Sequence, residues 1–416
     1  MGPHSLQGKT PLAALLISLL IATASSLVAR PTYAKWRPHQ IKQADGRGGW
    51  ITRPARIQTL KHPGGENTKP FGMAQMDNGE IIFIGSWHNG TKEVPVVTIS
   101  SDGGDTWSAL LAIPGQSGRP MMLTYLGGGN LSVITGSRLF SSDYGRTWPE
   151  SVPVPPTSDG LGFYSEGNAA IDRDANGMAT KVIESGCHFK PGKSHPIDDG
   201  TALIRHSTDG GRTWQGEVAP SAWKFTTLRE GKPHVRGITE GSLVRAVNGW
   251  LVAALRTDIT SALLAGPHND NLCGTAISIS KDDGRTWSPL NILFTAGRHH
   301  AQLHRLSDGM LVCVMIVRND WRDGRLAGHL GGCDALVSYD HGVSWNLDRR
   351  ITLDEFEYYN PDTPVSGRSG HIGSAVLDDG SILTAYGNYP RAAAVLVKWK
   401  PDVQPAQALK PSGSAP

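Results

Sequence analysis

Residues 207–214 read Ser-Thr-Asp-Gly-Gly-Arg-Thr-Trp, and their pattern Ser-x-Asp-x-Gly-x-Thr-Trp recurs along the chain. It returns at residues 100–107, 141–148, 280–287 and 338–345, the last copy with Ser in place of the Thr. Each copy has the composition of a tight turn, because the Asp can accept hydrogen bonds from backbone N–H groups and the Gly can adopt a positive φ. The final Trp is expected to pack as an apolar plug beneath a hairpin. Five copies indicate a repeat architecture such as a propeller.

The segments between these turns repeat a second pattern: an apolar strand, a turn ending in Gly, and another apolar strand. The Gly turns lie at residues 77–79, 127–129, 176–177, 248–249, 308–309 and 379–380. The last unit has no Ser-x-Asp turn and lacks a fourth strand, which the strand around Ile57 is expected to supply, closing the ring. The sequence therefore predicts an all-β, six-bladed β-propeller over residues 35–400, with residues 35–49 as a polar lead.

Composition agrees with that fold and restricts the class of partner. The 416 residues include 50 Gly, 27 Pro and 12 Trp, which suits a turn-rich all-β protein. The net charge of +3 and the lack of a basic run indicate neither a nucleic acid nor an anionic membrane as partner. A monomer is expected.

The two ends of the chain indicate export and a tail. Lys9 precedes an uncharged apolar run at residues 11–29, and residues 32–34, Thr-Tyr-Ala, offer a cleavage site. We expect a signal peptide at residues 1–34 and a secreted or periplasmic protein; an uncleaved anchor is the alternative. Residues 401–416, rich in Pro, Ala and Ser, are predicted to be a disordered tail. Four cysteines are compatible with disulfides in that compartment: Cys187, Cys273, Cys313 and Cys333.

A constant distance from the Gly turn identifies the residue that opens each inner strand. Eight places before the Asp or Asn of the turn stand Glu240, His300 and His371 in the fourth, fifth and sixth units. The same count gives Pro70 beside Lys69, then Arg119, then Asn168 near Glu166 in the first three units. The second strands end at the same mouth, at His88, Glu184, Arg256, Arg318 and Tyr386. Charged residues around a channel mouth indicate a binding site; solvated or mutually paired charges are the alternative.

The repeated turn resembles the Asp-box of the sialidase (neuraminidase) superfamily, which closes the turn between the third and fourth strands of a blade. Over roughly residues 50–400 the hairpin spacing is also similar, and Glu240 and Arg256 carry the closest match. The resemblance implies that Glu240 assists the nucleophile and that Arg256 joins an arginine cluster that binds the sugar carboxylate. The chain departs from the family where residues 69–72 replace an Arg-Ile-Pro motif, and where His371 stands in place of the nucleophilic Tyr.

These residues predict an exo-glycosidase that removes a terminal anionic sugar, with sialic acid implied by the resemblance. Glu240 is expected to act as nucleophile or base, and Glu166 or His88 as acid, because glycoside hydrolysis uses two carboxyl groups. His371 is the alternative catalytic group. A turn-capping role through Asn168 is the structural alternative for Glu166. The substrate-binding candidates are Lys69, Arg119, Arg256, Arg298, His300, Arg318, Arg368 and Tyr386.

Three alternatives stay open: a uronate-glycan lyase using His371, His300 and Tyr386, an exo-arabinanase-like glycosidase with a Glu pair, and a non-catalytic glycan-binding propeller. Each takes a glycan as partner. No third ligand is evident beside the two histidines, so neither a metal nor a cofactor is predicted.

Overall fold

The computed structural model describes residues 32–33, 35–64, 67–188, 201–229, 232–257, 273–322, 325–358 and 368–401. Within these ranges the chain is all-β, and its one helical segment is the 3-10 turn η3 (Leu347–Arg349). The predicted signal peptide and tail fall almost entirely outside the described residues. No helix in the described part is long and apolar enough to cross a bilayer.

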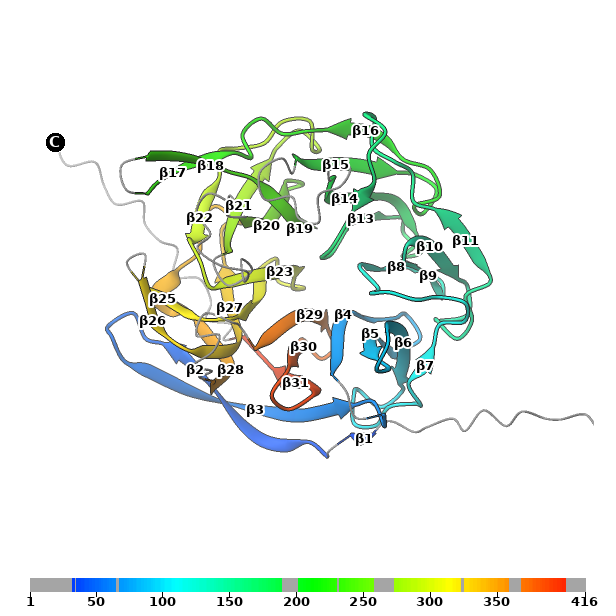
Figure 1. The fold of residues 1–416 in the computed structure, drawn as a ribbon, viewed down its shortest axis with the longest axis horizontal. Coiled ribbons are helices and arrows are strands. Elements are labelled where there is room, and N and C mark those ends of the chain that lie inside the picture. Colours follow the sequence, from blue (N-terminus) through cyan, green and yellow to red (C-terminus); the bar gives the residue numbers. More distant parts are fainter. Residues whose placement is uncertain are drawn as a thin grey trace, which may run out of the picture.

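Four antiparallel sheets lie around a common centre in a propeller-like arrangement, each with an innermost strand toward that centre (Figure 1). The first holds β4 (Thr68–Gln75), β5 (Ile81–His88), β6 (Glu93–Ser100) and β7 (Leu111–Ala112). The second holds β8 (Leu123–Gly127), β9 (Asn130–Ile134), β10 (Ser137–Ser141) and β11 (Glu150–Pro153). The third holds β12 (Phe163–Tyr164), β13 (Ala170–Arg173), β14 (Ala179–His188), β15 (Thr201–Ser207) and β16 (Gln215–Val218). The fourth holds β19 (Ile238–Arg245), β20 (Leu251–Thr257), β21 (Gly274–Ser280) and β22 (Asn291–Phe294).

A ten-stranded sheet completes the arrangement and has an inner strand, β23 or β29, at each of its two edges. In spatial order it holds β23 (Arg298–Arg305), β24 (Leu311–Val317), β27 (Leu330–Ser338), β28 (Ile351–Glu357), β2 (Arg37–Ala44), β3 (Trp50–Lys61), β31 (Ala393–Trp399), β30 (Ile382–Asn388) and β29 (Ser369–Val376), with β1 (Thr32–Tyr33) on β3. Two ribbons lie apart from it, one of β17 (Phe225–Arg229) and β18 (Lys232–Arg236), the other of β25 (Asp320–Arg322) and β26 (Arg325–Gly328).

The N-terminal strands join the two ends of the chain. β3 pairs with β31, and Ile57 lies opposite Val397, which is the ring closure that the sequence predicts. The expectation of a polar lead at residues 35–49 is wrong for residues 37–44, which form β2 between β3 and β28. The pairing of Lys42 with Thr352 joins segments far apart in the sequence, so no local pattern could indicate it. Ile41 in this strand is fully buried.

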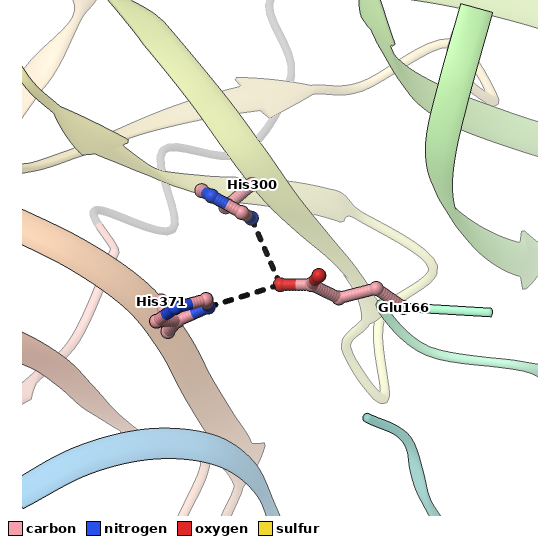
Figure 2. Close-up of side chains that lie close together, drawn as sticks. All are labelled: Glu166, His300 and His371. Atoms are coloured by element: carbon pink, nitrogen blue, oxygen red, sulfur yellow. Dashed lines mark hydrogen bonds and ion pairs between the residues drawn. The ribbon is translucent and has the colours of Figure 1, made fainter. Parts of the chain in front are cut away.

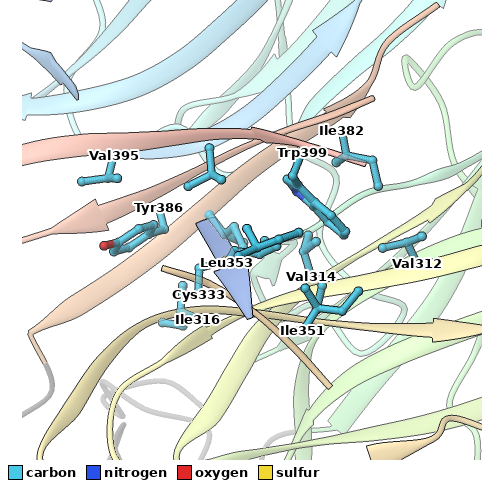
Figure 3. Close-up of a cluster of buried hydrophobic side chains, with 14 of the residues drawn as sticks. Val312, Val314, Ile316, Cys333, Ile351, Leu353, Ile382, Tyr386, Val395 and Trp399 are labelled. Atoms are coloured by element: carbon cyan, nitrogen blue, oxygen red, sulfur yellow. The ribbon is translucent and has the colours of Figure 1, made fainter. Parts of the chain in front are cut away.

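Apolar side chains from different strands of the ten-stranded sheet pack together in a buried cluster. Figure 3 shows one such cluster, in which Val314 and Leu353 meet Val395 and Trp399. Every residue of β24 is buried, which agrees with its continuous apolar sequence, because a strand covered on both faces has no solvent side.

The five repeated turns connect the third and fourth strands of their units and share one hydrogen-bond pattern. In residues 207–214 the Ser207 hydroxyl accepts from the Gly211 N–H at 2.7 Å, and Asp209 Oδ1 accepts from the Thr213 N–H at 2.9 Å. Although burial opposes the shift, the hydrogen bonds from Thr213 and Ser207 lower the pKa of Asp209 to about 2. The same two bonds occur in the other four copies. These turns therefore stabilise hairpins.

The four cysteines are buried thiols, so the disulfides that the sequence allows do not form in this structure. Cys313 and Cys333 lie on the neighbouring strands β24 and β27, but the register pairs Cys313 with Leu336. The two thiols also belong to hydrophobic clusters on opposite sides of the strands, which keeps them apart.

Candidate active site

Four inner strands carry a β-bulge near their first residues. The bulges take Phe71 in β4, Glu240 in β19, His300 in β23 and His371 in β29 out of the regular pairing. A bulge re-aims a side chain, and bulges are frequent beside active sites. His300 and His371 also have φ angles of 49° and 54°, a region that non-glycine residues rarely adopt. Strained backbone of this kind is typical of functional sites.

Three of the predicted residues meet in one buried cluster (Figure 2). His300 Nδ1 lies 2.9 Å from Glu166 Oε1, and His371 Nδ1 lies 3.3 Å from the same oxygen. His300 Nδ1 is also 3.1 Å from Glu240 Oε2, so Glu240 is the fourth member. The eight-residue spacing identified Glu240, His300 and His371, whereas in the third unit the residue in the cluster is Glu166 and not Asn168.

Glu166 is held by its own connection between β12 and β13. The Tyr164 hydroxyl donates to Glu166 Oε2 at 2.8 Å. The neighbouring Ser165 hydroxyl donates to the Ser185 carbonyl at 2.8 Å and ties the segment to β14. Tyr164 was not among the sequence candidates. In the sequence, Tyr164 is marked only by its place two residues before Glu166, and that spacing is too common to indicate a site.

Glu240 is paired with Arg256, which lies across from the bulge on β20. Arg256 Nη1 donates to both carboxylate oxygens of Glu240, at 2.8 and 3.0 Å. Arg256 Nη2 also lies 3.4 Å from Cys273 Sγ. The guanidinium therefore compensates a carboxylate of the protein itself.

The cluster combines two ionised carboxylates with one cationic and one neutral imidazole. Burial raises the pKa of Glu166, but the charge of His300 at 2.9 Å and the hydrogen bond with His371 hold that pKa well below its usual value. Burial also raises the pKa of Glu240, and the charge of Arg256 outweighs this and lowers it. Neither carboxyl group therefore holds a proton at neutral pH in this state.

The two histidines shift in opposite directions. Burial lowers the pKa of His300, but the carboxylates of Glu240 and Glu166 outweigh it and raise that pKa to about 9. For His371 burial is the larger effect and lowers the pKa to about 4. Near pH 7 the proton of the cluster is thus on His300, and His371 is a neutral base.

A void of about 10 Å³ lies against Glu166, Glu240, Arg256 and His300. A space of this size holds about one water molecule. A second cavity, of about 580 Å³, occupies the opposite end of the inner strands, where the lining includes Tyr125, Arg173, Arg245, His304 and Arg305. None of the sequence candidates lines that cavity.

Lys69 and Arg119 lie beside a third carboxylate. Glu93 accepts hydrogen bonds from the Lys69 ammonium and, at 2.6 Å, from the Ser86 hydroxyl. Arg119 Nε lies 3.8 Å from Glu93, and 45% of the Arg119 side chain is exposed. The charge of Arg119 acts on His371, and the Phe71 ring lies against His371 with the ring centroids 4.2 Å apart. Arg119 therefore keeps a solvent-accessible positive charge near the site.

Two of the predicted substrate-binding residues are engaged in the protein interior. Arg298 is buried and its Nε donates to Asp334 at 2.7 Å, so it forms an internal ion pair. Tyr386 is fully buried in an apolar cluster, and its hydroxyl donates to Asp354 at 2.6 Å. The sequence analysis expected both at the channel mouth, because strand ends line that mouth. In the structure, Asp334 of β27 and Asp354 of β28 bind these two side chains in the interior.

Glu184 was also expected at the mouth, and it too lies in the protein interior. It is fully buried between two arginines, with Arg138 Nη2 at 2.7 Å and Arg205 Nη2 at 2.8 Å. Buried charges need such partners. Glu184 is therefore a structural residue of the third sheet.

The remaining candidates lie around the cluster. Arg318 lies against Gly370, the residue before His371. One of its guanidinium nitrogens is 3.1 Å from the position that a Cβ atom would have on Gly370. The Arg368 guanidinium stacks over the Tyr358 ring, 4.5 Å from its centroid. His88 is the last residue of β5, and its Nδ1 accepts from the Gly90 N–H at 3.2 Å. It is not one of the residues that hold the cluster together.

Comparison with known proteins gives a fold and no family. No protein-family profile and no curated protein matches the chain. A protein of unknown function from Dyadobacter fermentans DSM 18053 has a similar structure, with a TM-score of 0.56 and 17% identity over 83% of this chain and 99% of the other. The two chains share a fold.

Two enzymes of known structure are similar at a lower level. An alpha-L-arabinanase from Penicillium chrysogenum, complexed with arabinobiose, has a TM-score of 0.48 and 12% identity over 88% of this chain and 98% of its own. The NanB sialidase from Streptococcus pneumoniae has a TM-score of 0.48 and 12% identity over 82% of this chain and 69% of its own. Scores below 0.5 have no bearing on what this chain does.

Proposed function

We propose that this protein is an exo-glycosidase of propeller fold that hydrolyses the bond to a terminal anionic sugar. One observation carries the proposal: two buried, ionised carboxylates, Glu166 and Glu240, meet on one imidazole nitrogen. Two oxygens that each lie about 3 Å from the same nitrogen are at most about 6 Å apart. A pair of carboxyl groups that flank one small space is the arrangement that glycoside hydrolysis requires.

The ionisation pattern supports distinct roles for the two glutamates. Glu240, beside Arg256, stays ionised and attacks the anomeric carbon. As that bond forms, the bond to the leaving oxygen breaks, and the leaving oxygen takes the proton shared by Glu166 and His300. The same pair then removes a proton from the water that releases the sugar. The short separation of the carboxylates favours this retaining course, since an inverting pair needs about 6.5–9.5 Å.

Recognition of an anionic sugar falls to the cations near the cluster. Arg119 is the strongest candidate because 45% of its side chain is exposed and its ion pair with Glu93 is long, at 3.8 Å. Arg318, Arg368 and Lys69 are the further candidates. An arginine fork suits a carboxylate. Sialic acid is the sugar that the Asp-box resemblance implies.

The Asp-box resemblance also supports a specific number of blades and an assignment of the repeated turns. We propose that the large sheet counts as two blades joined by β2, which makes six blades, and that the five Ser-x-Asp turns are Asp-boxes. Export through cleavage near Ala34 is part of the proposal, and it concerns residues outside the described ranges.

The experiment is a turnover assay of the purified protein with sialosides, uronides and arabinans, followed by Glu240→Gln. We expect release of an anionic monosaccharide, and a loss of kcat of at least about 1,000-fold in the variant, because a catalytic carboxylate is removed. Glu150→Gln, at an exposed ion pair with Arg212, is the matched control and should turn over normally. Near-normal kcat in Glu240→Gln contradicts the assignment.

A uronate-glycan lyase is the second candidate, and one observation favours it. His371 is a neutral base at pH 7, and Glu166 links it to the Tyr164 hydroxyl. In this second candidate, Tyr164 takes the catalytic role that the sequence analysis gave to Tyr386. An unsaturated product detected by ultraviolet absorbance decides for the lyase, because hydrolysis forms no double bond.

A further inference from the structure

Three electron-pair donors converge on one point inside the cluster. The atoms are Glu166 Oε1, His300 Nδ1 and His371 Nδ1, and they all lie within 4.8 Å of one another. They come from the β12–β13 connection, β23 and β29, so three separate segments each contribute one donor atom. The sequence showed two histidines without a third ligand because Glu166 lies far from both along the chain.

One imidazole nitrogen of this group, Nδ1 of His300, faces two carboxylate oxygens. Both carboxylate contacts of His300 Nδ1 are short enough for a hydrogen bond, yet neither has the alignment of one, and this buried nitrogen has no hydrogen-bond partner among the described residues. A single N–H cannot point at two carboxylate oxygens at once. An ion placed among the three donors satisfies all of them together.

The distances fit a first-row transition metal. Bonds of about 2.0–2.1 Å at tetrahedral angles place neighbouring ligand atoms about 3.3 Å apart. Glu166 Oε1 lies 2.9 and 3.3 Å from the two imidazole nitrogens, and those two nitrogens lie within 4.8 Å of each other. Two imidazoles and one carboxylate suit Zn²⁺ and its neighbours, whereas Ca²⁺ and Mg²⁺ take oxygen ligands. The adjoining void leaves space for one water as a fourth ligand.

We propose that Glu166, His300 and His371 bind one divalent transition-metal ion of the Zn²⁺ class. The surroundings have the features of an outer shell: the Tyr164 hydroxyl donates to Glu166 Oε2, the oxygen that does not face the histidines. Such partners orient a ligating carboxylate. Glu240, held by Arg256, adds negative charge beside the ion.

The inference goes beyond the proposed glycosidase and touches it at one step. Glu166, His300 and His371 would hold the ion, which would supply an acidic bound water able to replace the Glu166–His300 pair as proton donor to the leaving oxygen, because a metal lowers the pKa of its water toward 7. Metal binding is measured without turnover, so the two proposals fail separately. A glycosidase that binds no metal overturns only this inference, and a metal protein without turnover overturns only the enzyme.

The test is equilibrium dialysis of the chelator-treated full chain against ZnCl₂ or MnCl₂, with metal content by elemental mass spectrometry and affinity by titration calorimetry. We expect about one tightly bound Zn²⁺ per chain and no displacement by excess CaCl₂. Glu166→Gln and His371→Ala should each weaken binding at least about 100-fold, more than the loss of an outer partner. Tyr164→Phe should weaken it by about 10–100-fold.

Controls separate this site from adventitious histidines and from misfolding. His206→Ala removes a part-buried imidazole from β15 in the third sheet and should leave the stoichiometry and affinity unchanged. Glu166→Gln preserves the side-chain volume, and circular dichroism checks that it folds. Less than a tenth of an equivalent in the wild type, or equal binding in the wild type and both ligand variants, overturns the proposal.

Discussion

Oε1 of Glu166 lies 2.9 Å from Nδ1 of His300, although one residue belongs to the third sheet and the other opens an edge strand of the ten-stranded sheet. The contact is buried, and it connects ionised Glu166 and Glu240 through one cationic ring. Its charge state should therefore contribute both to stability and to chemistry.

Stability should decrease in alkaline solution because of His300. Its folded pKa of about 9 lies above the ordinary 6.5, so its contribution is complete below pH 6.5 and is lost as pH rises through 9. The shift corresponds to about 3 kcal/mol. Urea unfolding in chelator should show wild type more stable than His300→Gln at pH 6, with the difference shrinking by pH 10. A constant difference across this range contradicts the raised pKa.

Arg256 should control the ionisation of Glu240. Burial and the charge of Glu166 both raise the pKa of Glu240, and Arg256 is the largest influence that lowers it. In Arg256→Ala the acid limb of the pH profile of kcat/KM should move to higher pH. Arg256→Lys keeps the charge and should move the limb less. An unmoved acid limb in Arg256→Ala would mean that Glu240 does not titrate in catalysis.

Arg119 and Arg298 should separate recognition from stability. Arg119→Ala removes an exposed charge and should raise KM for an anionic sugar at least tenfold while the free energy of unfolding changes by less than about 0.5 kcal/mol. Arg298→Ala leaves Asp334 buried without its partner and should lower the free energy of unfolding by about 3–5 kcal/mol. Equal effects of the two substitutions on KM, with no difference in unfolding, would refute this division.

Asp209 should matter for stability alone. Asp209→Ala leaves turn N–H groups without an acceptor and should lower the free energy of unfolding by about 1–3 kcal/mol, measured in urea. Asp105→Ala is the control, because its ion pair with Arg56 is exposed and contributes little. A variant of Asp209 that melts normally but loses turnover would show that the turn belongs to the site.

The local pattern of the sequence predicts the repeating units. The apolar run at residues 311–317 is β24 with the same bounds, and the Gly turn at 308–309 precedes it. Hydrogen bonds and side-chain alternation within a hairpin involve neighbours in the chain, so they leave a signal in the residues themselves. The constant spacing from those turns also identified Glu240, His300 and His371, because each inner strand bulges at a corresponding place.

Only the tertiary structure decided what those side chains contact. It pairs Arg256 with Glu240, draws Tyr386 to Asp354, and places Tyr164 and Glu166 beside two histidines from other strands. Each partner lies on a separate strand or connection, and the packing and register of whole sheets determine which atoms meet. Since burial and the nearest charges set each pKa, the chemistry of the cluster follows from that packing.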